Sequence, residues 1–121
     1  MDFLYRQGVV SIYRDDKQGL CVVVNKDVRK DRLLYINAVG FIGFDALKED
    51  SKFNDYPMYW NSKTDCISFG VINLLNHAEC PSVYIVRDRK KNLMKMYAGR
   101  NLKKGEECTI HYACKLWFDV V

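Results

Sequence analysis

The chain has 121 residues, enough for one domain with its own core, and its 49% hydrophobic and 28% charged residues are ordinary for a folded protein. Its longest apolar run, Leu20–Val24, is five residues, whereas a membrane-spanning helix needs roughly 18. The start, Met1–Arg6, carries an acid and a base among its apolar residues and does not resemble a signal peptide. We therefore expect one domain over residues 1–121 and no contact with a membrane.

The five cysteines are odd in number and scattered, with no Cys-x-x-Cys pair. Such spacing signals neither a disulfide framework nor a zinc ribbon, and Cys commonly behaves as a small core residue. We expect buried thiols in a reducing, intracellular compartment and no metal site. The residues are Cys21, Cys66, Cys80, Cys108 and Cys114.

The net charge is +4, from 19 basic and 15 acidic residues. Basic residues cluster at Lys26–Arg32, Arg87–Lys91 and Arg100–Lys104, where they could contact nucleic-acid phosphates. Each cluster falls at a predicted turn, and no aromatic residues are interleaved to stack on bases. We expect no dedicated nucleic-acid site, and a basic nucleic-acid-binding protein is a third, motif-free alternative.

The first half of the chain predicts short strands and one irregular loop. β-Branched apolar runs predict strands at Val9–Tyr13, Leu20–Asn25 and Leu33–Val39. Asp45–Asp50 has the composition of a short helix, and Ser51–Asp65 reads as an irregular loop that carries aromatic residues.

The second half predicts further short strands. These are Cys66–Phe69, a hairpin of Val83–Arg87 and Leu93–Ala98, and a last strand at Cys108–Tyr112. The tail Ala113–Val121 predicts one amphipathic turn. Periodicity alone therefore predicts a small, mainly β domain with long connections, which are typical of binding sites.

Three motifs carry more specific information. They are Gly19–Val28 (GLCVVVNKDV), Asn76–Pro81 (NHAECP) and Lys104–Tyr112 (KGEECTIHY). In this order they resemble the signature of the SET-domain lysine methyltransferases, which combines an Asn-His-Ser-x-x-Pro run with a Gly-Glu-Glu-x-Thr-x-x-Tyr run. The resemblance implies a β-clip fold, in which small curved sheets surround a threaded C-terminal pseudoknot. It also implies S-adenosylmethionine as the cofactor and a protein lysine as the methyl acceptor.

The resemblance also implies roles for individual residues. The catalytic residue would be Tyr112, whose hydroxyl orients the methyl donor and the incoming amine. The cofactor would be bound by the segment Gly19, Leu20 and Cys21, by Asn76 and His77, and by Tyr112 and Trp117.

The C-terminal part resembles the minimal SET proteins of large DNA viruses. Only Cys114 follows Tyr112, so the cysteine-rich zinc segment found after many SET domains is not expected. The lysine channel would instead be lined by Tyr56, Trp117 and Phe118.

Three residues depart from the family pattern and favour a competing hypothesis. Cys21 replaces a glycine, which puts the usual pose of this loop on the cofactor in question. Ala78 and Ser82 stand where Ser and Asn are usual, and both of these changes remove a hydrogen-bonding group. These changes favour a SET-like module that holds a peptide without transferring methyl groups. The retained Asn76, His77 and Tyr112 argue instead for an enzyme.

The expected substrate is a lysine in a basic peptide, such as a histone tail. The stretch Asp45–Tyr56 carries four acids and two lysines in an otherwise basic protein, although a solvated loop would look the same. A homodimer is left open. The expected location is the host nucleus for a viral, histone-directed enzyme and the cytoplasm otherwise.

Overall fold

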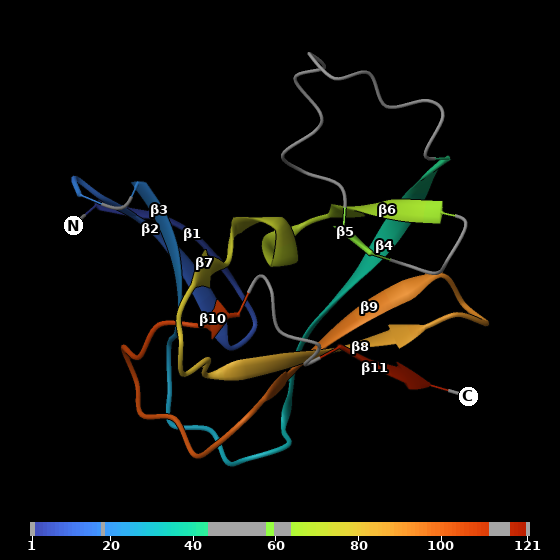
Figure 1. Cartoon of the computed structure of the whole chain (residues 1–121). Coiled ribbons are helices and arrows are strands. Elements are labelled where there is room, and N and C mark those ends of the chain that lie inside the picture. Colours follow the sequence, from blue (N-terminus) through green and yellow to red (C-terminus); the bar gives the residue numbers. More distant parts are fainter. Residues whose placement is uncertain (1, 18, 44–57, 60–63, 112–116, 121) are drawn as a thin grey trace.

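The computed structural model describes residues 2–17, 19–43, 58–59, 64–111 and 117–120, and in 40–43, 58–59, 64–69 and 117–120 it describes the backbone alone. Strands dominate these residues and form three sheets (Figure 1). The described part contains one helical element, the 3₁₀ turn η2 (Val71–Leu74), and no helix there is long and apolar enough to cross a bilayer.

The first sheet is an antiparallel meander of β1 (Asp2–Gln7), β2 (Val10–Asp15) and β3 (Gly19–Val24). β2 and β3 confirm the two strands predicted from β-branched runs. The sequence did not predict β1, because all six of its residues are exposed and no buried face imposes an alternating pattern.

The largest sheet has six strands in the order β11-β8-β9-β4-β6-β5. The predicted hairpin is confirmed as β8 and β9, and the predicted strand from Leu33 is confirmed and longer than expected. The strand bounds are β4 Leu33–Gly43, β5 Met58–Tyr59, β6 Thr64–Phe69, β8 Val83–Asp88, β9 Leu93–Ala98 and β11 Trp117–Val120.

The predicted amphipathic turn in the tail is wrong for residues 117–120. They form β11, which pairs in parallel with the edge of β8, with Trp117 opposite Ile85. Hydrogen bonding to an open sheet edge is a long-range gain that a short local pattern does not reveal. The predicted helix Asp45–Asp50 and most of the loop Ser51–Asp65 lie outside the described residues.

One hydrophobic cluster joins the sheets. It draws side chains from β2, β3, β4, β8, β9, η2 and the segment after Arg100, so the first sheet packs on the same core as the largest one (Figure 1). Its members are Val10, Val22, Val24, Val28, Leu34, Val71, Ile72, Leu75, Val83, Ile85, Met94, Met96, Ala98, Leu102, Cys108 and Ile110.

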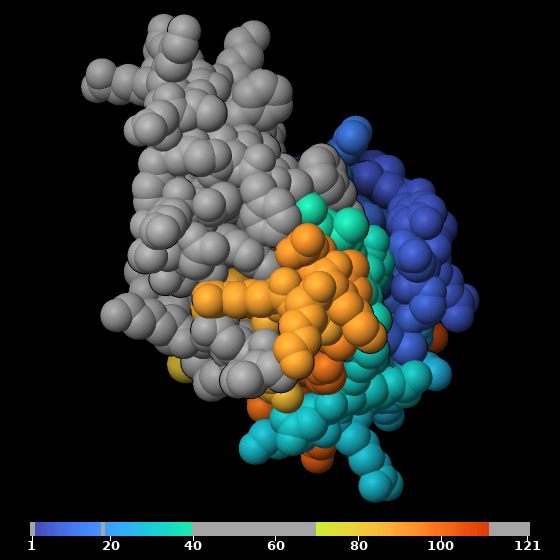
Figure 2. All heavy atoms as spheres, turned by 90° about the vertical axis from the view of Figure 1, so that its right-hand side faces the viewer, coloured from blue at the N-terminus to red at the C-terminus, as the bar shows by residue number. Residues whose placement is uncertain are grey.

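The turn that follows β3 packs on the turn that follows β9. A bridge joins Val28 to Leu102, and each of these residues donates its backbone N–H to the carbonyl of the other. In the space-filling view, the chain after β3 projects at the lower end of the molecule (Figure 2, cyan). The third sheet is the parallel pair β7 (Asn76–His77) and β10 (Thr109–Ile110), which is treated below as part of the candidate site.

The thiols should differ in reactivity. Burial, and secondarily the charge of Glu107, raises the pKa of Cys108 to about 12, whereas Cys80 is exposed. At pH 8 only about one Cys108 thiol in ten thousand is then ionised, and the thiolate is the reactive form. Iodoacetamide at pH 8 should label Cys80 within minutes and leave Cys108 unlabelled, as read by peptide mass spectrometry.

Labelling in urea is the control, because unfolding should expose Cys108 and make both thiols react. The raised pKa also means that the folded state holds the Cys108 proton more tightly than the unfolded state. Its contribution to stability is complete below pH 9 and declines as the pH rises toward 12. Equal labelling of the two thiols in the folded protein would contradict the buried position of Cys108.

Candidate functional site

Residues 105–110 form the centre of the candidate site, because they pair with chain on both sides. On one side they pair with β3. Cys108 donates its N–H to the Val22 carbonyl at 2.7 Å, and Gly105 donates to the Val24 carbonyl at 2.8 Å. Val24 in turn donates to the Glu106 carbonyl at 3.0 Å. Gly105 begins this segment at a φ of +94°, which glycine adopts without strain.

On the other side, β10 pairs in parallel with β7. Thr109 lies opposite Asn76 and Ile110 opposite His77, and Ala78 donates its N–H to the Ile110 carbonyl at 2.9 Å. Residues 105–110 therefore run between β3 and residues 76–82 and are hydrogen-bonded to both. These six residues form the laced segment. This is the threaded arrangement that the family resemblance implies, and it brings all three sequence motifs together (Figure 1).

The buried side chain of Ser82 stabilises this arrangement through hydrogen bonds to Glu107 and Thr109. Its buried hydroxyl donates to the Glu107 carbonyl at 2.7 Å and accepts from the Thr109 N–H at 2.9 Å. The Ser82 N–H donates to the Thr109 carbonyl and hydroxyl. Although Ser stands where the family usually has Asn, its hydroxyl still serves the local network, so the expected loss is not observed here.

Asn76 connects all three segments through its side-chain amide. Its Nδ2 donates to the Leu20 carbonyl at 3.0 Å and to the Glu107 Oε2 at 2.7 Å. One amide group thus ties the start of β3 to the motif before β10. Of the residues predicted to bind the cofactor, Leu20 and Asn76 are brought together, and Gly19 and Cys21 flank Leu20 in β3. His77 follows Asn76 in β7, but its side chain contacts Glu79 and His111.

The start of β3 offers accessible backbone beside Asn76. Gly19 is exposed at a φ of +80°, and a Cβ at this position would meet no atom within 4 Å. Cys21, which replaces the second family glycine, is buried, so its side chain points away from solvent. Burial, followed by the charges of Glu107 and Asp15, raises the pKa of this thiol.

A polar cluster lies at the outer end of β7 and β10. Nε2 of His77 is 3.3 Å from Oε1 of Glu79, and Nε2 of His111 is 3.1 Å from Oε2 of the same carboxylate. The two imidazole rings meet edge to face at a centroid distance of 4.5 Å. The hydrogen bonds from His77 and then His111 lower the pKa of the Glu79 carboxyl, which keeps it ionised.

The structure does not describe the side chains of the remaining predicted site residues. Tyr112, the predicted catalytic residue, and Tyr56 of the predicted channel lie outside the described residues. Trp117 and Phe118 are described as backbone only, in β11, opposite Ile85 and Val86 of β8. Their predicted roles stay predictions.

Comparison with known proteins identifies the family. The SET domain family matches residues 19–113, which is most of the chain and includes all three motifs. The chain is therefore a member of the SET domain family.

Two relatives are informative. The chain is 32% identical over 66 residues to a histone-lysine N-methyltransferase, H3 lysine-37 specific, of Schizosaccharomyces pombe. That match covers 54% of this chain and 45% of the yeast protein. The fold is similar to the crystal structure of a Plasmodium falciparum protein described as a candidate histone methyltransferase, with a TM-score of 0.72, 24% identity, and coverage of 89% of this chain and 96% of the other.

Sequence reasoning missed three residues of this region, which are Glu79, Glu107 and His111. Glu107 accepts from Asn76, and Glu79 joins His77 to His111. The second Glu of the Gly-Glu-Glu motif was a signal for Glu107. No local signal pointed to the Glu79 cluster, because its members meet only when β7 and β10 align.

Replacing Ser82 with Ala should weaken the laced segment. The change leaves the Glu107 carbonyl and the Thr109 N–H without their buried partner, at a cost of about 1–3 kcal/mol in the free energy of unfolding. Urea denaturation measures the cost. Ser11→Ala is the matched control, since Ser11 is equally buried and, among the described residues, its hydroxyl accepts one hydrogen bond, from Asn25 at 3.2 Å.

The control should cost about 1 kcal/mol or less, because Asn25 retains its bond to the Gly8 carbonyl. Equal losses in the two variants would mean that the Ser82 hydroxyl has no special part in holding residues 105–110.

Proposed function

We propose that this protein is an S-adenosylmethionine-dependent protein-lysine N-methyltransferase that acts on a histone tail or another basic peptide. The observation that carries the proposal is the side chain of Asn76, which joins the β3 motif and the Gly-Glu-Glu motif in one place. Membership of the SET domain family and the resemblance to a histone-lysine methyltransferase of yeast support it.

The residues present suit a cofactor of this kind. Gly19 leaves open space above the backbone, and the neighbouring Asn76 and His77 are polar and accessible. Backbone without a Cβ and amide or imidazole groups are common partners for a nucleoside and an amino-acid group. Gly19, Leu20, Asn76 and His77 would hold the cofactor, and Tyr112 and Trp117 would complete its site.

S-adenosylmethionine, when bound, supplies an electrophilic methyl group on a sulfonium. The protein would align a lysine amine with it, and such positioning is worth several kcal/mol. A lysine with a pKa of about 10.4 must first lose a proton, and a channel of aromatic side chains lowers this pKa by desolvation, so that solvent can accept the proton. The Tyr112 hydroxyl would orient the amine, and Tyr56, Trp117 and Phe118 would line the channel.

Tyr112→Phe should retain the fold and cofactor binding but lose methyl transfer by about 10²-fold or more. The change keeps the ring and removes a single oriented hydroxyl at the reacting centre. Transfer of labelled methyl groups to core histones measures activity, and calorimetry with S-adenosylmethionine measures binding. His77→Ala should instead weaken cofactor binding, so the two variants separate binding from chemistry.

Tyr97→Phe is the matched control, because Tyr97 stacks on Tyr84 within the β8–β9 hairpin. It should leave both readouts unchanged. If Tyr112→Phe matches wild type within twofold, Tyr112 is not the catalytic tyrosine and Tyr56 takes its place as the candidate. If wild type binds the cofactor and a histone peptide but transfers no methyl group, the SET-like peptide-binding module is the correct hypothesis.

The substrate proposal makes a separate prediction about charge. If the acidic stretch 45–56 attracts a basic peptide, the double change Asp50→Lys and Asp55→Lys should raise KM for a histone-tail peptide, and more so at low ionic strength. Steady-state kinetics at two salt concentrations measure this. Asp16→Lys, an exposed change in the β2–β3 turn, is the control. An unchanged KM would assign stretch 45–56 to the scaffold.

Two finer proposals depend on the resemblance alone. Kinship with minimal viral SET proteins rests on Trp117 and Phe118 following Tyr112 closely in the sequence. A histone-directed enzyme of viral origin would act in the host nucleus, and one with another protein substrate would act in the cytoplasm.

A further inference from the structure

Three side chains with metal-binding atoms converge at the outer end of β7 and β10. They are His77, Glu79 and His111, whose imidazole nitrogens and carboxylate oxygen all lie within 4.8 Å of one another. Both imidazoles direct Nε2 at the Glu79 carboxylate, one at each oxygen, at 3.3 and 3.1 Å. Two residues come from the β7 segment and one follows β10, so the cluster exists only in the folded chain.

We propose that His77, Glu79 and His111 form a binding site for a transition-metal dication, with zinc the preferred ion. Two imidazoles and one carboxylate are a donor set that zinc accepts, leaving a fourth position for water. Zinc bonds of about 2.0–2.2 Å to nitrogen and oxygen place tetrahedral ligand atoms about 3.4 Å apart. Each Nε2 already lies close to this distance from one oxygen of Glu79, and the three ligand atoms as a set lie within 4.8 Å of one another.

The backbone pre-arranges the two imidazoles. Ile110 is in register with His77, and Ala78 donates to the Ile110 carbonyl, which fixes where His111 follows. The rings meet edge to face at a centroid distance of 4.5 Å, so His111, one residue beyond β10, lies beside His77. Glu79 is 84% exposed and can swing to a metal at little cost in buried contacts.

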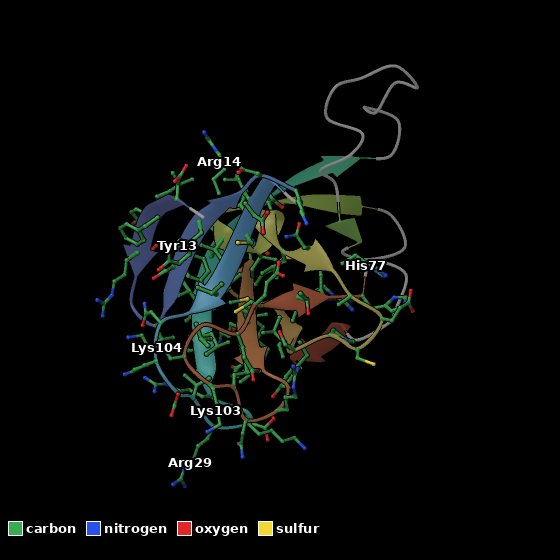
Figure 3. The ribbon with its side chains drawn as sticks, turned by 90° about the vertical axis from the view of Figure 1, so that its left-hand side faces the viewer. Tyr13, Arg14, Arg29, His77, Lys103 and Lys104 are labelled. Atoms are coloured by element: carbon green, nitrogen blue, oxygen red, sulfur yellow. The ribbon has the colours of Figure 1, made fainter. Side chains whose placement is uncertain are left out.

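The surroundings of the three side chains suit a cation site of moderate affinity. In Figure 3, His77 lies at the right of the molecule, whereas the basic residues Arg29, Lys103 and Lys104 lie at the lower left. Glu79 offers a carboxylate oxygen to the cluster. Nδ1 of His111 is buried without a hydrogen-bond partner among the described residues, whereas tight sites anchor this nitrogen. We therefore expect a micromolar rather than a nanomolar dissociation constant.

A bound ion would cross-link β7 to β10. Each strand is only two residues long, so a link between His77 and His111 should stabilise the laced segment by mass action. Tyr112 follows His111 directly in the sequence, so one proposed metal ligand is the sequence neighbour of the predicted catalytic tyrosine. The site does not rest on the proposed methyltransferase function, since metal binding can be measured without any cofactor.

The test uses the full chain after treatment with EDTA and dialysis. Calorimetry with Zn²⁺ should show one site of micromolar affinity, and Co²⁺ should give visible absorption bands without the thiolate charge-transfer band that cysteine ligands produce. A Zn²⁺ concentration tenfold above the dissociation constant should raise the melting temperature by about 5 °C.

Variants assign the ligands. Glu79→Gln and His111→Gln should each weaken Zn²⁺ binding at least about tenfold. Asp16→Asn, which removes an exposed carboxylate elsewhere, and Cys80→Ser, which removes the exposed thiol, should leave binding unchanged. Glu79→Gln keeps the test valid if His111→Gln does not fold, because Glu79 is largely exposed.

Absence of Zn²⁺ binding at 1 mM would overturn the proposal and leave a hydrogen-bonded His–Glu–His cluster. Binding that survives Glu79→Gln, or that is lost in Cys80→Ser, would equally overturn it by assigning the ion to other ligands.

Discussion

Residues 105–110 are hydrogen-bonded on both sides, and the candidate site depends on this double pairing. β3 accepts from Cys108 and Gly105, while β7 aligns with β10 in parallel. Strands of two residues have little stability of their own. The buried Ser82 hydroxyl and the burial of Cys108 and Ile110 in the core provide the additional stability that the two-residue strands lack. Because the segment is held from both sides, Leu20, Asn76 and Glu107 meet, although they lie far apart in the sequence.

The local elements could be predicted where a pattern repeats within a few residues. The β8–β9 hairpin alternates buried and accessible positions, and β2 and β3 are β-branched runs around a polar turn. β1 and β11 could not be predicted in this way. β1 buries no side chain, and β11 is defined by pairing with β8, which is more than 30 residues earlier in the chain. Such strands are specified by partners, not by their own sequence.

The same distinction between local sequence patterns and long-range pairing applies to the residues of the candidate site. Asn76 and His77 were predicted from their motif, and the structure adds that the Asn76 amide is the junction of three segments. The cluster of His77, Glu79 and His111 was not predicted, and a metal site was not expected from scattered cysteines. No spacing rule covers ligands that come together by the register of two parallel strands. His111 directly follows β10, and the predicted catalytic Tyr112 is its neighbour in the sequence, so the proposed metal site adjoins a residue with a predicted role in methyl transfer.

The central claim is that the laced segment and its two neighbours form the cofactor site. Hydrogen exchange with and without S-adenosylmethionine tests it most directly, because exchange reports local opening segment by segment. Saturating cofactor should slow exchange in residues 19–24, 76–82 and 105–111 and leave the β8–β9 hairpin, residues 83–98, unchanged. Slowing confined to the hairpin, or no change in any segment at a saturating concentration, would contradict the account.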